Sequence, residues 1–166
     1  MNQTATSTKT SPTRRRIAAL SASWHRDIVH QARDAFLAEL AREGVDADQV
    51  DLFDLPGAFE IPLLAQRLAR SGDYDAVACF GLVVDGGIYR HDFVASAVID
   101  ALMRVQLDTG VPVFSAVLTP RDFHEHDEHR RFFAAHFVKK GEAVAQACLD
   151  TLGSLQALRE GSAQAL

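Results

Sequence analysis

The strongest constraint on the fold is a repeated alternation between short apolar runs and longer amphipathic stretches. The apolar runs have the length of buried strands, and the stretches that follow them carry the apolar stripe of helices that cover a sheet. Strands that alternate with helices in this way are typical of βαβ units, in which a helix connects two parallel strands. Because such crossovers are right-handed, helices should cover both faces of the sheet. The sequence therefore predicts an α/β fold with a parallel sheet.

The expected strands and helices follow one another along the chain. We expect strands at Arg16–Ala22, Val50–Leu55, Tyr74–Val84 and Val111–Leu118. We expect helices at Asp27–Arg42, Phe59–Arg70, His91–Leu107 and Gly141–Leu158. The second strand alternates apolar and acidic residues, which favours a place near an edge of the sheet, whereas the other three have the apolar character of buried strands.

Length and composition place these elements in one globular domain. The 166 residues are 48% hydrophobic and 23% charged, which is typical of a protein with a single core. Residues 1–15 are polar and are predicted to form a disordered tail, residues 16–158 form the domain, and residues 159–166 are expected to fray. The net charge of −5 gives no reason to expect nucleic acid or an anionic membrane as a partner.

Two further features bear on the cellular compartment. No apolar run approaches the roughly 20 residues that span a bilayer, and the polar N-terminal stretch lacks the apolar core of a signal peptide. The two cysteines, Cys79 and Cys148, fall on a buried-strand pattern and a helical pattern, and are expected to be reduced thiols. The sequence therefore predicts a cytoplasmic protein.

Four segments follow directly on the predicted strands or close them. They are Ser23–His25, Pro56–Glu60, Val84–His91 and Ser115–Pro120. In parallel sheets of this kind, ligands bind beyond the carboxyl ends of the strands. We therefore expect these four segments to form one site.

The Asp85-Gly86-Gly87 turn lies between a predicted buried strand and a predicted helix. A glycine pair in this place lets backbone N–H groups approach an anion, although the same residues also form ordinary turns. Arg90 and His91 follow at once, the first a fixed cation and the second able to transfer protons near neutral pH. The turn and its two followers are candidates for the chemistry of the site.

Trp24 and Glu60 each allow two interpretations. Trp24 ends a strand, where its flat ring could stack on a heteroaromatic ligand or could simply be half-buried in packing. Glu60 lies at a strand-to-helix junction, where its carboxylate could accept hydrogen bonds from sugar hydroxyls or could only complement the helix dipole. The backbone N–H groups of Ala58, Phe59 and Glu60 lack intrahelical partners at a helix start and could bind a ligand.

The segment His124–Arg130 holds three histidines among charged residues. It lacks the zincin spacing, because the fourth position after His124 is Glu128. A solvated helical face is the commonest explanation of such a run; metal binding is a second, and a third is that His129 or Arg130 folds over the site and holds a phosphate. The chain also lacks the GxxxxGK[ST], GxGxxG, GxSxG and CxxC patterns, which argues against nucleotide hydrolysis, dinucleotide redox chemistry and serine-esterase chemistry.

Three strings of residues together resemble the lumazine synthase family. They are Pro56–Pro62 (PGAFEIP), Gly81–Val94 (GLVVDGGIYRHDFV) and Gly110–Val113 (GVPV). The resemblance runs from about Arg16 to Leu158, and the first string is highly specific. Trp24 in place of the usual Phe, the Asp85–Phe93 string and the His-rich Thr119–Lys140 segment resemble the type II branch of the family.

The resemblance implies a flavodoxin-like three-layer α/β/α sandwich with a central four-stranded parallel sheet. It implies an enzyme that condenses 5-amino-6-(D-ribitylamino)uracil with 3,4-dihydroxy-2-butanone 4-phosphate, giving 6,7-dimethyl-8-ribityllumazine and phosphate without a cofactor or metal. The family's sites form between neighbouring subunits of a homo-pentamer, and the type II branch suggests a decamer of two pentamers.

The resemblance also assigns roles to residues by position. Trp24 would stack on the pyrimidine ring, and the ribityl chain would be bound by Ala58, Phe59 and Glu60. The ring pocket would be lined by the backbone of Leu82, Val83 and Val84, with Ser115 at the end of the ring-binding strand. The phosphate-binding turn would contain Gly87 and Ile88, and His129 would stand in the place of a phosphate-binding Arg.

Three departures from the family pattern affect these roles. The family's catalytic His aligns with Arg90, so either Arg90 acts electrostatically on phosphate or the adjacent His91 transfers protons. Ile88 replaces a hydroxyl-bearing residue at the phosphate turn, which predicts a weaker phosphate contact. The segment from Thr119 to Gly141 is longer than usual, which leaves open whether His129 or Arg130 is the phosphate cation.

Two alternatives to the enzyme remain at the level of sequence. The first is a protein of the same fold that binds riboflavin or lumazine and catalyses poorly, which the stacking Trp24 and the altered phosphate residues motivate. The second is a metal-binding module built on His124, His126 and His129.

Overall fold

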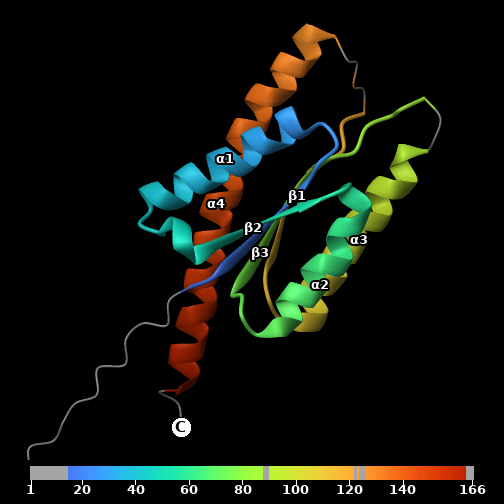
Figure 1. Cartoon of the computed structure of the whole chain (residues 1–166). Helices are drawn as coiled ribbons and strands as arrows, with labels where there is room; N and C mark the ends of the chain where they lie inside the picture. The colour runs from blue at the N-terminus through green and yellow to red at the C-terminus, as the bar shows by residue number, and fades with distance from the viewer. Residues whose placement is uncertain (1–14, 88–89, 122, 124–125, 164–166) are drawn as a thin grey trace, which may run out of the picture.

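The computed structural model of the chain, which describes residues 15–87, 90–121, 123 and 126–163, has the predicted α/β architecture (Figure 1). The sheet has four parallel strands in the order β2-β1-β3-β4. The strands are β1 (Ile17–Ala22), β2 (Val50–Leu55), β3 (Ala76–Leu82) and β4 (Val113–Leu118). The α-helices are α1 (Arg26–Arg42), α2 (Ile61–Ser71), α3 (His91–Thr109) and α4 (Asp127–Ala163), and two 3₁₀ turns are η1 (Ala47–Gln49) and η2 (Ala58–Glu60).

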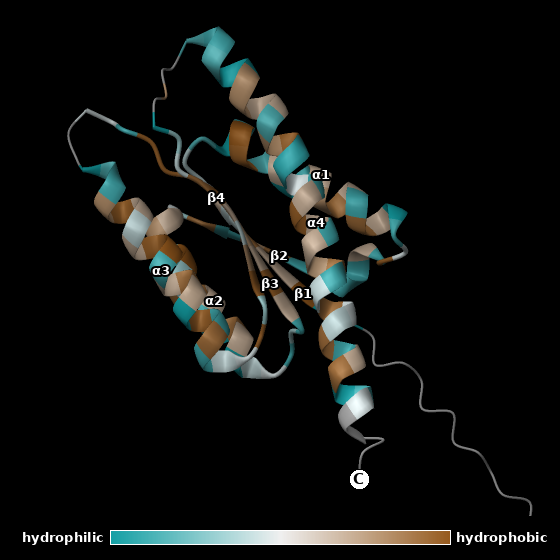
Figure 2. Ribbon diagram, turned by 180° about the vertical axis from the view of Figure 1, so that it is seen from behind, coloured by the Kyte–Doolittle hydropathy of each residue, from teal (hydrophilic) through white to brown (hydrophobic). Residues whose placement is uncertain are grey.

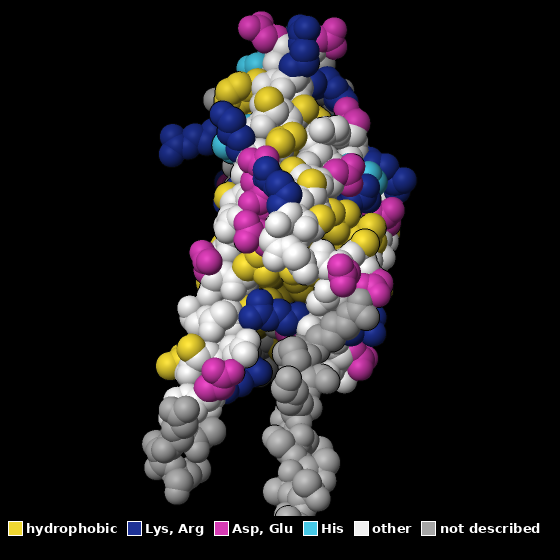
Figure 3. All heavy atoms as spheres, turned by 90° about the vertical axis from the view of Figure 1, so that its left-hand side faces the viewer, with side chains coloured by type: hydrophobic (Ala, Val, Ile, Leu, Met, Phe, Trp, Pro, Cys, Tyr) yellow, Lys and Arg dark blue, Asp and Glu magenta, His cyan; other side chains and the backbone are white. Residues whose placement is uncertain are grey.

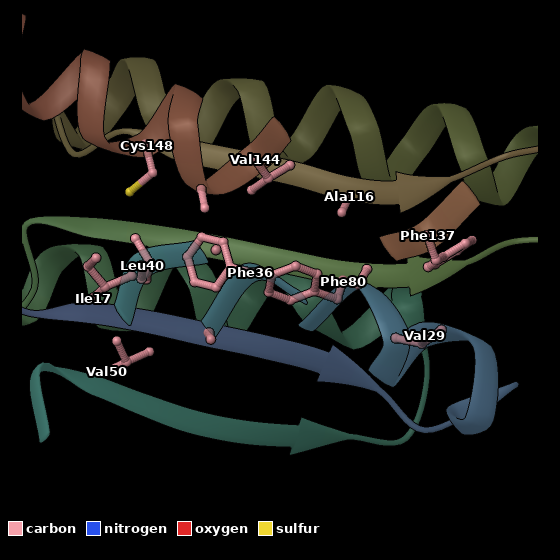
Figure 4. Close-up of a cluster of buried hydrophobic side chains, with 14 of the residues drawn as sticks. Ile17, Val29, Phe36, Leu40, Val50, Phe80, Ala116, Phe137, Val144 and Cys148 are labelled. Atoms are coloured by element: carbon pink, nitrogen blue, oxygen red, sulfur yellow. The ribbon is translucent and has the colours of Figure 1, made fainter. Parts of the chain in front are cut away.

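The sheet is the middle of three layers. Helices α1 and α4 cover one face and helices α2 and α3 cover the other, as the two opposite views show (Figures 1 and 2). Each side has its own apolar core, and Figure 4 shows the one beneath α1 and α4. There the Phe36 ring of α1 meets the Phe80 ring of β3 edge to face, with 5.3 Å between centroids. The flavodoxin-like three-layer sandwich is therefore confirmed.

The position of each strand follows from its sequence. The central strands β1 and β3 are buried at every residue, because helices cover both of their faces. The acidic strand β2 lies at an edge of the sheet, as its alternating pattern predicts. Strand β4 lies at the opposite edge and is only partly buried, so the expectation that it is a buried strand was wrong. The carboxyl ends of all four strands lie at the same end of the sheet, because the strands are parallel.

The last helix departs most from the expectation. Helix α4 begins at Asp127 and runs through Gly141 to Ala163, whereas the sequence predicted a helix from Gly141 to Leu158 and fraying beyond it. Gly141 does not start the helix but is the point where α4 approaches α1. A Cβ atom at this position would lie 2.1 Å from the carbonyl oxygen of Ala32. Residues 1–14 and 164–166 lie outside the described part of the chain.

A polar cluster joins strands at the end of the sheet opposite to the strands' carboxyl ends. The Arg16 guanidinium pairs with Asp51, and the Tyr74 hydroxyl donates a hydrogen bond of 2.7 Å to the same carboxylate. These two hydrogen bonds lower the pKa of Asp51. Burial, and then the bond to Asp51, raises the pKa of Tyr74 to about 12. The cluster ties β1 and β2 to the start of β3.

One face of the molecule carries charges of both signs. On the face shown in Figure 3, acidic and basic side chains lie next to one another among smaller apolar groups. None of the described helices combines the length and apolar composition needed to cross a membrane.

Candidate active site

A cavity of about 730 Å³ lies beyond the carboxyl ends of the strands. Its size is that of a small-molecule site, and most of its wall is apolar. It brings together eight of the residues that the sequence singled out. These are Trp24, Ala58, Phe59, Glu60, Leu82, Val83, Val84 and His91.

The first wall of the cavity is the turn between β1 and α1. The Ser23 N–H donates a hydrogen bond of 2.8 Å to the carbonyl of Leu55, which fixes the start of the turn to β2. Trp24 follows and is 72% exposed while lining the cavity. The packing interpretation requires a half-buried side chain, whereas an exposed indole presents its face to a ligand.

The second wall is the turn between β2 and α2. Here η2 holds Ala58, Phe59 and Glu60 in a single 3₁₀ turn that leads into α2. The Glu60 side chain makes no capping hydrogen bond to α2. Its carboxylate folds back over Gly57, where a Cβ atom would lie 3.1 Å from the Glu60 Oε2 atom. Glu60 and Gly57 both line the cavity.

The third wall follows β3. Leu82 ends the strand, and Val83 and Val84 continue beyond it, so the predicted strand end at Val84 was two residues too late. The Val83 N–H still donates a hydrogen bond of 2.9 Å to the carbonyl of Leu118, which holds this segment against β4. All three residues line the cavity, although the Leu82 and Val83 side chains are buried in the cores on opposite faces of the sheet.

The glycine turn lies at the rim. The Asp85 carboxylate accepts a hydrogen bond of 2.8 Å from the Gly87 N–H, and Gly87 has a φ of 76°, which favours glycine. Asp85 and Gly86 line the cavity, whereas Gly87 does not. Ile88, the other residue of the expected phosphate turn, lies outside the described residues.

Arg90 and His91 point to different places. The Arg90 guanidinium donates two hydrogen bonds to the Asp92 carboxylate, of 3.2 Å from Nε and 2.9 Å from an Nη atom. It also lies 4.4 Å from the centroid of the Phe93 ring, a cation–π geometry. The hydrogen bond raises the pKa of Arg90 and lowers that of Asp92. His91, the first residue of α3, lines the cavity, and Arg90 does not.

Three other predicted site residues lie outside the wall of this cavity. Ser115 stands within β4 opposite Cys79, three residues before the strand ends, so its expected place at the strand end was wrong. Its hydroxyl accepts a hydrogen bond of 3.3 Å from the Val117 N–H. Arg130 forms an ion pair with Asp27 of α1. His129 packs on Phe133, with 6.1 Å between ring centroids.

The cavity also contains residues to which the sequence assigned no individual role. His25, which belongs to the predicted site segment Ser23–His25, lines it together with Val94 and Phe123. Val94 lies one helical turn beyond His91, a spacing that could have been used to find it. Phe123 is 8% exposed and meets the His25 ring edge to face at 5.3 Å, a contact between distant segments that no local pattern signals.

No metal site is formed among the described residues, where no group of three His, Cys, Asp or Glu side chains could hold an ion. His124 of the suggested metal module lies outside those residues. Cys79 and Cys148 are free thiols, both buried. Burial raises the pKa of both, that of Cys148 to about 12, so neither is a reactive thiolate near neutral pH.

Comparison with known proteins gives one consistent family. The family model described as 6,7-dimethyl-8-ribityllumazine synthase matches residues 14–156. A protein of that name from Rhodococcus erythropolis is 62% identical over 143 residues, which is 86% of this chain and 92% of the relative.

Two further relatives carry the name 6,7-dimethyl-8-ribityllumazine synthase 2. The one from Pseudomonas syringae pv. tomato is 53% identical over 90% of this chain and 88% of its own. The one from Bradyrhizobium diazoefficiens is 57% identical over 87% of this chain and 86% of its own. These names agree with the resemblance to the type II branch. Because the family model matches most of its length and these relatives share more than half of its aligned residues, the chain belongs to the 6,7-dimethyl-8-ribityllumazine synthase family.

Proposed function

We propose that the cavity is the place where this chain carries out the reaction of its family. Its membership makes the chain an enzyme of riboflavin biosynthesis. The reaction condenses 5-amino-6-(D-ribitylamino)uracil with 3,4-dihydroxy-2-butanone 4-phosphate to 6,7-dimethyl-8-ribityllumazine and phosphate, the penultimate step of that pathway. The observation that carries the proposal is the convergence of Trp24, the η2 turn and His91 on one cavity.

The walls of the cavity suit the ribitylaminouracil. Its flat ring would stack on the exposed face of Trp24 and lie against Leu82, Val83 and Val84. Its ribityl hydroxyls would donate to the Glu60 carboxylate and accept from the N–H groups at the start of η2. An apolar slot with a few convergent polar groups is the usual form of such a site.

His91 is our proposed proton-transfer group. Schiff-base formation, phosphate elimination and ring closure each move protons, and an imidazole can do so near neutral pH. A guanidinium stays charged, and that of Arg90 is bound to Asp92 rather than turned to the cavity. Much of the remaining rate gain would come from holding both substrates together.

Phosphate recognition requires more than this cavity supplies. Among the described residues that line it there is no Lys or Arg. We propose that Gly87 and Ile88 form the phosphate turn and that either His129 or Arg130 supplies the phosphate-binding cation to the site of a neighbouring subunit. Since Ile88 carries no hydroxyl, the phosphate contact at the turn would be weak.

A homo-oligomer would bring these residues together. Helix α3 exposes large apolar side chains, with Phe93, Met103 and Leu107 exposed by 63%, 54% and 73%. Water-exposed groups of this size and number favour a partner surface. We propose a homo-pentamer, and for this branch a decamer of two pentamers, in the cytoplasm and without nucleic acid, membrane, metal or cofactor.

A steady-state assay with both substrates tests the proposed function. Lumazine should form well above the uncatalysed rate, with one phosphate released for each product. Glu60→Ala should raise KM for the ribitylaminouracil by about 10- to 100-fold, since the loss of hydrogen bonds to a charged group costs about 1.5–3 kcal/mol. Glu128→Gln, an exposed carboxylate on α4, is the matched control and should leave KM unchanged.

The opposite result would favour the binding-protein alternative. If no lumazine formed above the uncatalysed rate while quenching of Trp24 fluorescence showed tight binding of riboflavin, the chain would bind flavins without making their precursor. The relatives described above are named as synthases, which supports the enzyme.

A further inference from the structure

His25 has an unusual backbone conformation. Among the described residues it is the only non-glycine residue with a positive φ, at φ 53° and ψ 41°. This left-handed conformation is costly for a residue with a Cβ atom, although His tolerates it better than most. Backbone strain of this kind persists where surrounding contacts enforce it, and it is concentrated at functional sites.

Contacts on two sides hold His25 in place. Its carbonyl accepts hydrogen bonds of 2.9 Å from the N–H groups of Ile28 and Val29, which begins α1. Its ring meets the edge of Phe123 at 5.3 Å, and Phe123 in turn lies 5.3 Å from Phe133 of α4. His25 and Phe123 both line the cavity. The strained residue is therefore part of the candidate active site.

The conformation of His25 decides where Trp24 can point. Strand β1 ends at Ala22 and α1 begins at Arg26, so the chain turns within the three residues Ser23–His25. Ile28 and Val29, immediately beyond the turn, are fully buried, whereas Trp24 is 72% exposed. A left-handed residue lets the chain turn sharply enough to bury the helix start and still leave the indole outside.

We propose that His25 is a positioning residue, whose left-handed backbone holds the Trp24 side chain open over the cavity so that a planar heteroaromatic ring can stack on it. The role belongs to the backbone of His25, and the imidazole contributes packing against Phe123. This inference deepens the proposed function and rests on it for the identity of the ring.

Three variants separate the backbone from the ring of residue 25. His25→Gly and His25→Asn keep access to the left-handed conformation, so riboflavin affinity, measured by quenching of Trp24 fluorescence, should stay within about threefold of wild type. His25→Val places a β-branched residue at positive φ, and riboflavin should bind at least about tenfold more weakly. Ala38→Val, at an exposed position of α1, is the matched control and should bind as wild type.

A measurement without ligand keeps the test independent of the enzymatic reaction. Trp24 is the only tryptophan, so its acrylamide quenching reports its accessibility directly. The quenching constant should be unchanged in His25→Gly and His25→Asn and should change in His25→Val. The proposal is overturned if a folded His25→Val shows wild-type quenching and riboflavin affinity, or if His25→Gly loses riboflavin affinity as strongly as His25→Val. Failure of the lumazine assay alone would contradict the proposed function and not the role of His25.

Discussion

Arg90 and His91 are adjacent in the chain, yet only His91 lies in the wall of the cavity. Sequence position places both at the candidate site, because the family's catalytic position falls on the first and an imidazole follows. It could not predict the direction of the Arg90 side chain. That direction depends on the Asp92 carboxylate and the Phe93 ring, which together hold the guanidinium on the outside of the α3 start. The sequence therefore left both residues as candidates, and the direction of the Arg90 side chain could be seen only in the structure.

His30 should make the stability of the protein depend on pH. Its ring is 18% exposed and lies 3.1 Å from an Arg33 nitrogen and 3.6 Å from the Asp54 carboxylate. Burial and then the Arg33 charge lower its pKa, an effect that Asp54 does not reverse. As the pH falls through about 6.5, the unfolded chain takes up a proton at His30 before the folded chain does, so the free energy of unfolding falls.

Denaturant unfolding on either side of that pH checks the prediction. His30→Gln should reduce the loss of unfolding free energy between about pH 7.5 and 5.5, because the titrating group is gone. His136→Gln, which removes an exposed imidazole on α4, is the control and should keep the wild-type loss. An equal loss in His30→Gln and wild type would show that His30 does not carry the effect.

At the scale of elements, the packing of α4 on α1 depends on Gly141. Gly141→Ala should destabilise the protein by at least about 1–3 kcal/mol, the usual cost of overpacking, because the new methyl group would overlap the Ala32 carbonyl. Gly153→Ala in the same helix is the matched control. No atom lies within 4 Å of a Cβ there, and the change should stabilise the helix by about 0.5–1 kcal/mol. Chemical denaturation of both variants measures this, and equal effects would contradict the packing argument.

The sequence predicted the elements whose signals are local. Val50–Leu55 was predicted with its observed bounds, because alternating residues and the following Pro56-Gly57 mark both the strand and its end. The helix predicted at Gly141–Leu158 was shorter than the observed α4. A glycine after a charged run resembles a helix start when the helix that packs against it is unknown. In the same way, the contact between His25 and Phe123 joins residues about a hundred positions apart and depends on the tertiary structure.

At the scale of the whole molecule, the apolar stripe of α3 points to assembly. Ile99, Met103 and Leu107 recur every four residues on the face turned away from the core. Met103→Glu should shift native mass from the proposed pentamer or decamer towards single chains, because it places a charge in that surface. Gln31→Glu makes the same charge change at an exposed position of α1 and should leave the native mass of the assembly unaltered. A wild-type chain that runs as an 18.1 kDa monomer would contradict the assembly.

The molecule presents a cavity at the carboxyl ends of its strands, which we propose binds the substrate ring. The groups that bind the substrate's phosphate are proposed to come from the glycine turn and from a neighbouring subunit. We propose that the condensation takes place in this cavity and that His91 transfers its protons. The turnover number of His91→Ala, compared with that of Arg90→Ala, tests this proposal when both variants are assayed with saturating substrates across pH.

His91→Ala should lose about 10²–10⁴-fold in turnover, the usual contribution of a general acid–base group, and should lose the limb of the pH profile that this group governs. Arg90→Ala should lose less than about tenfold, because its exposed pair with Asp92 lies outside the cavity. Full turnover in His91→Ala at every pH, together with a large loss in Arg90→Ala, would show that His91 does not transfer the protons.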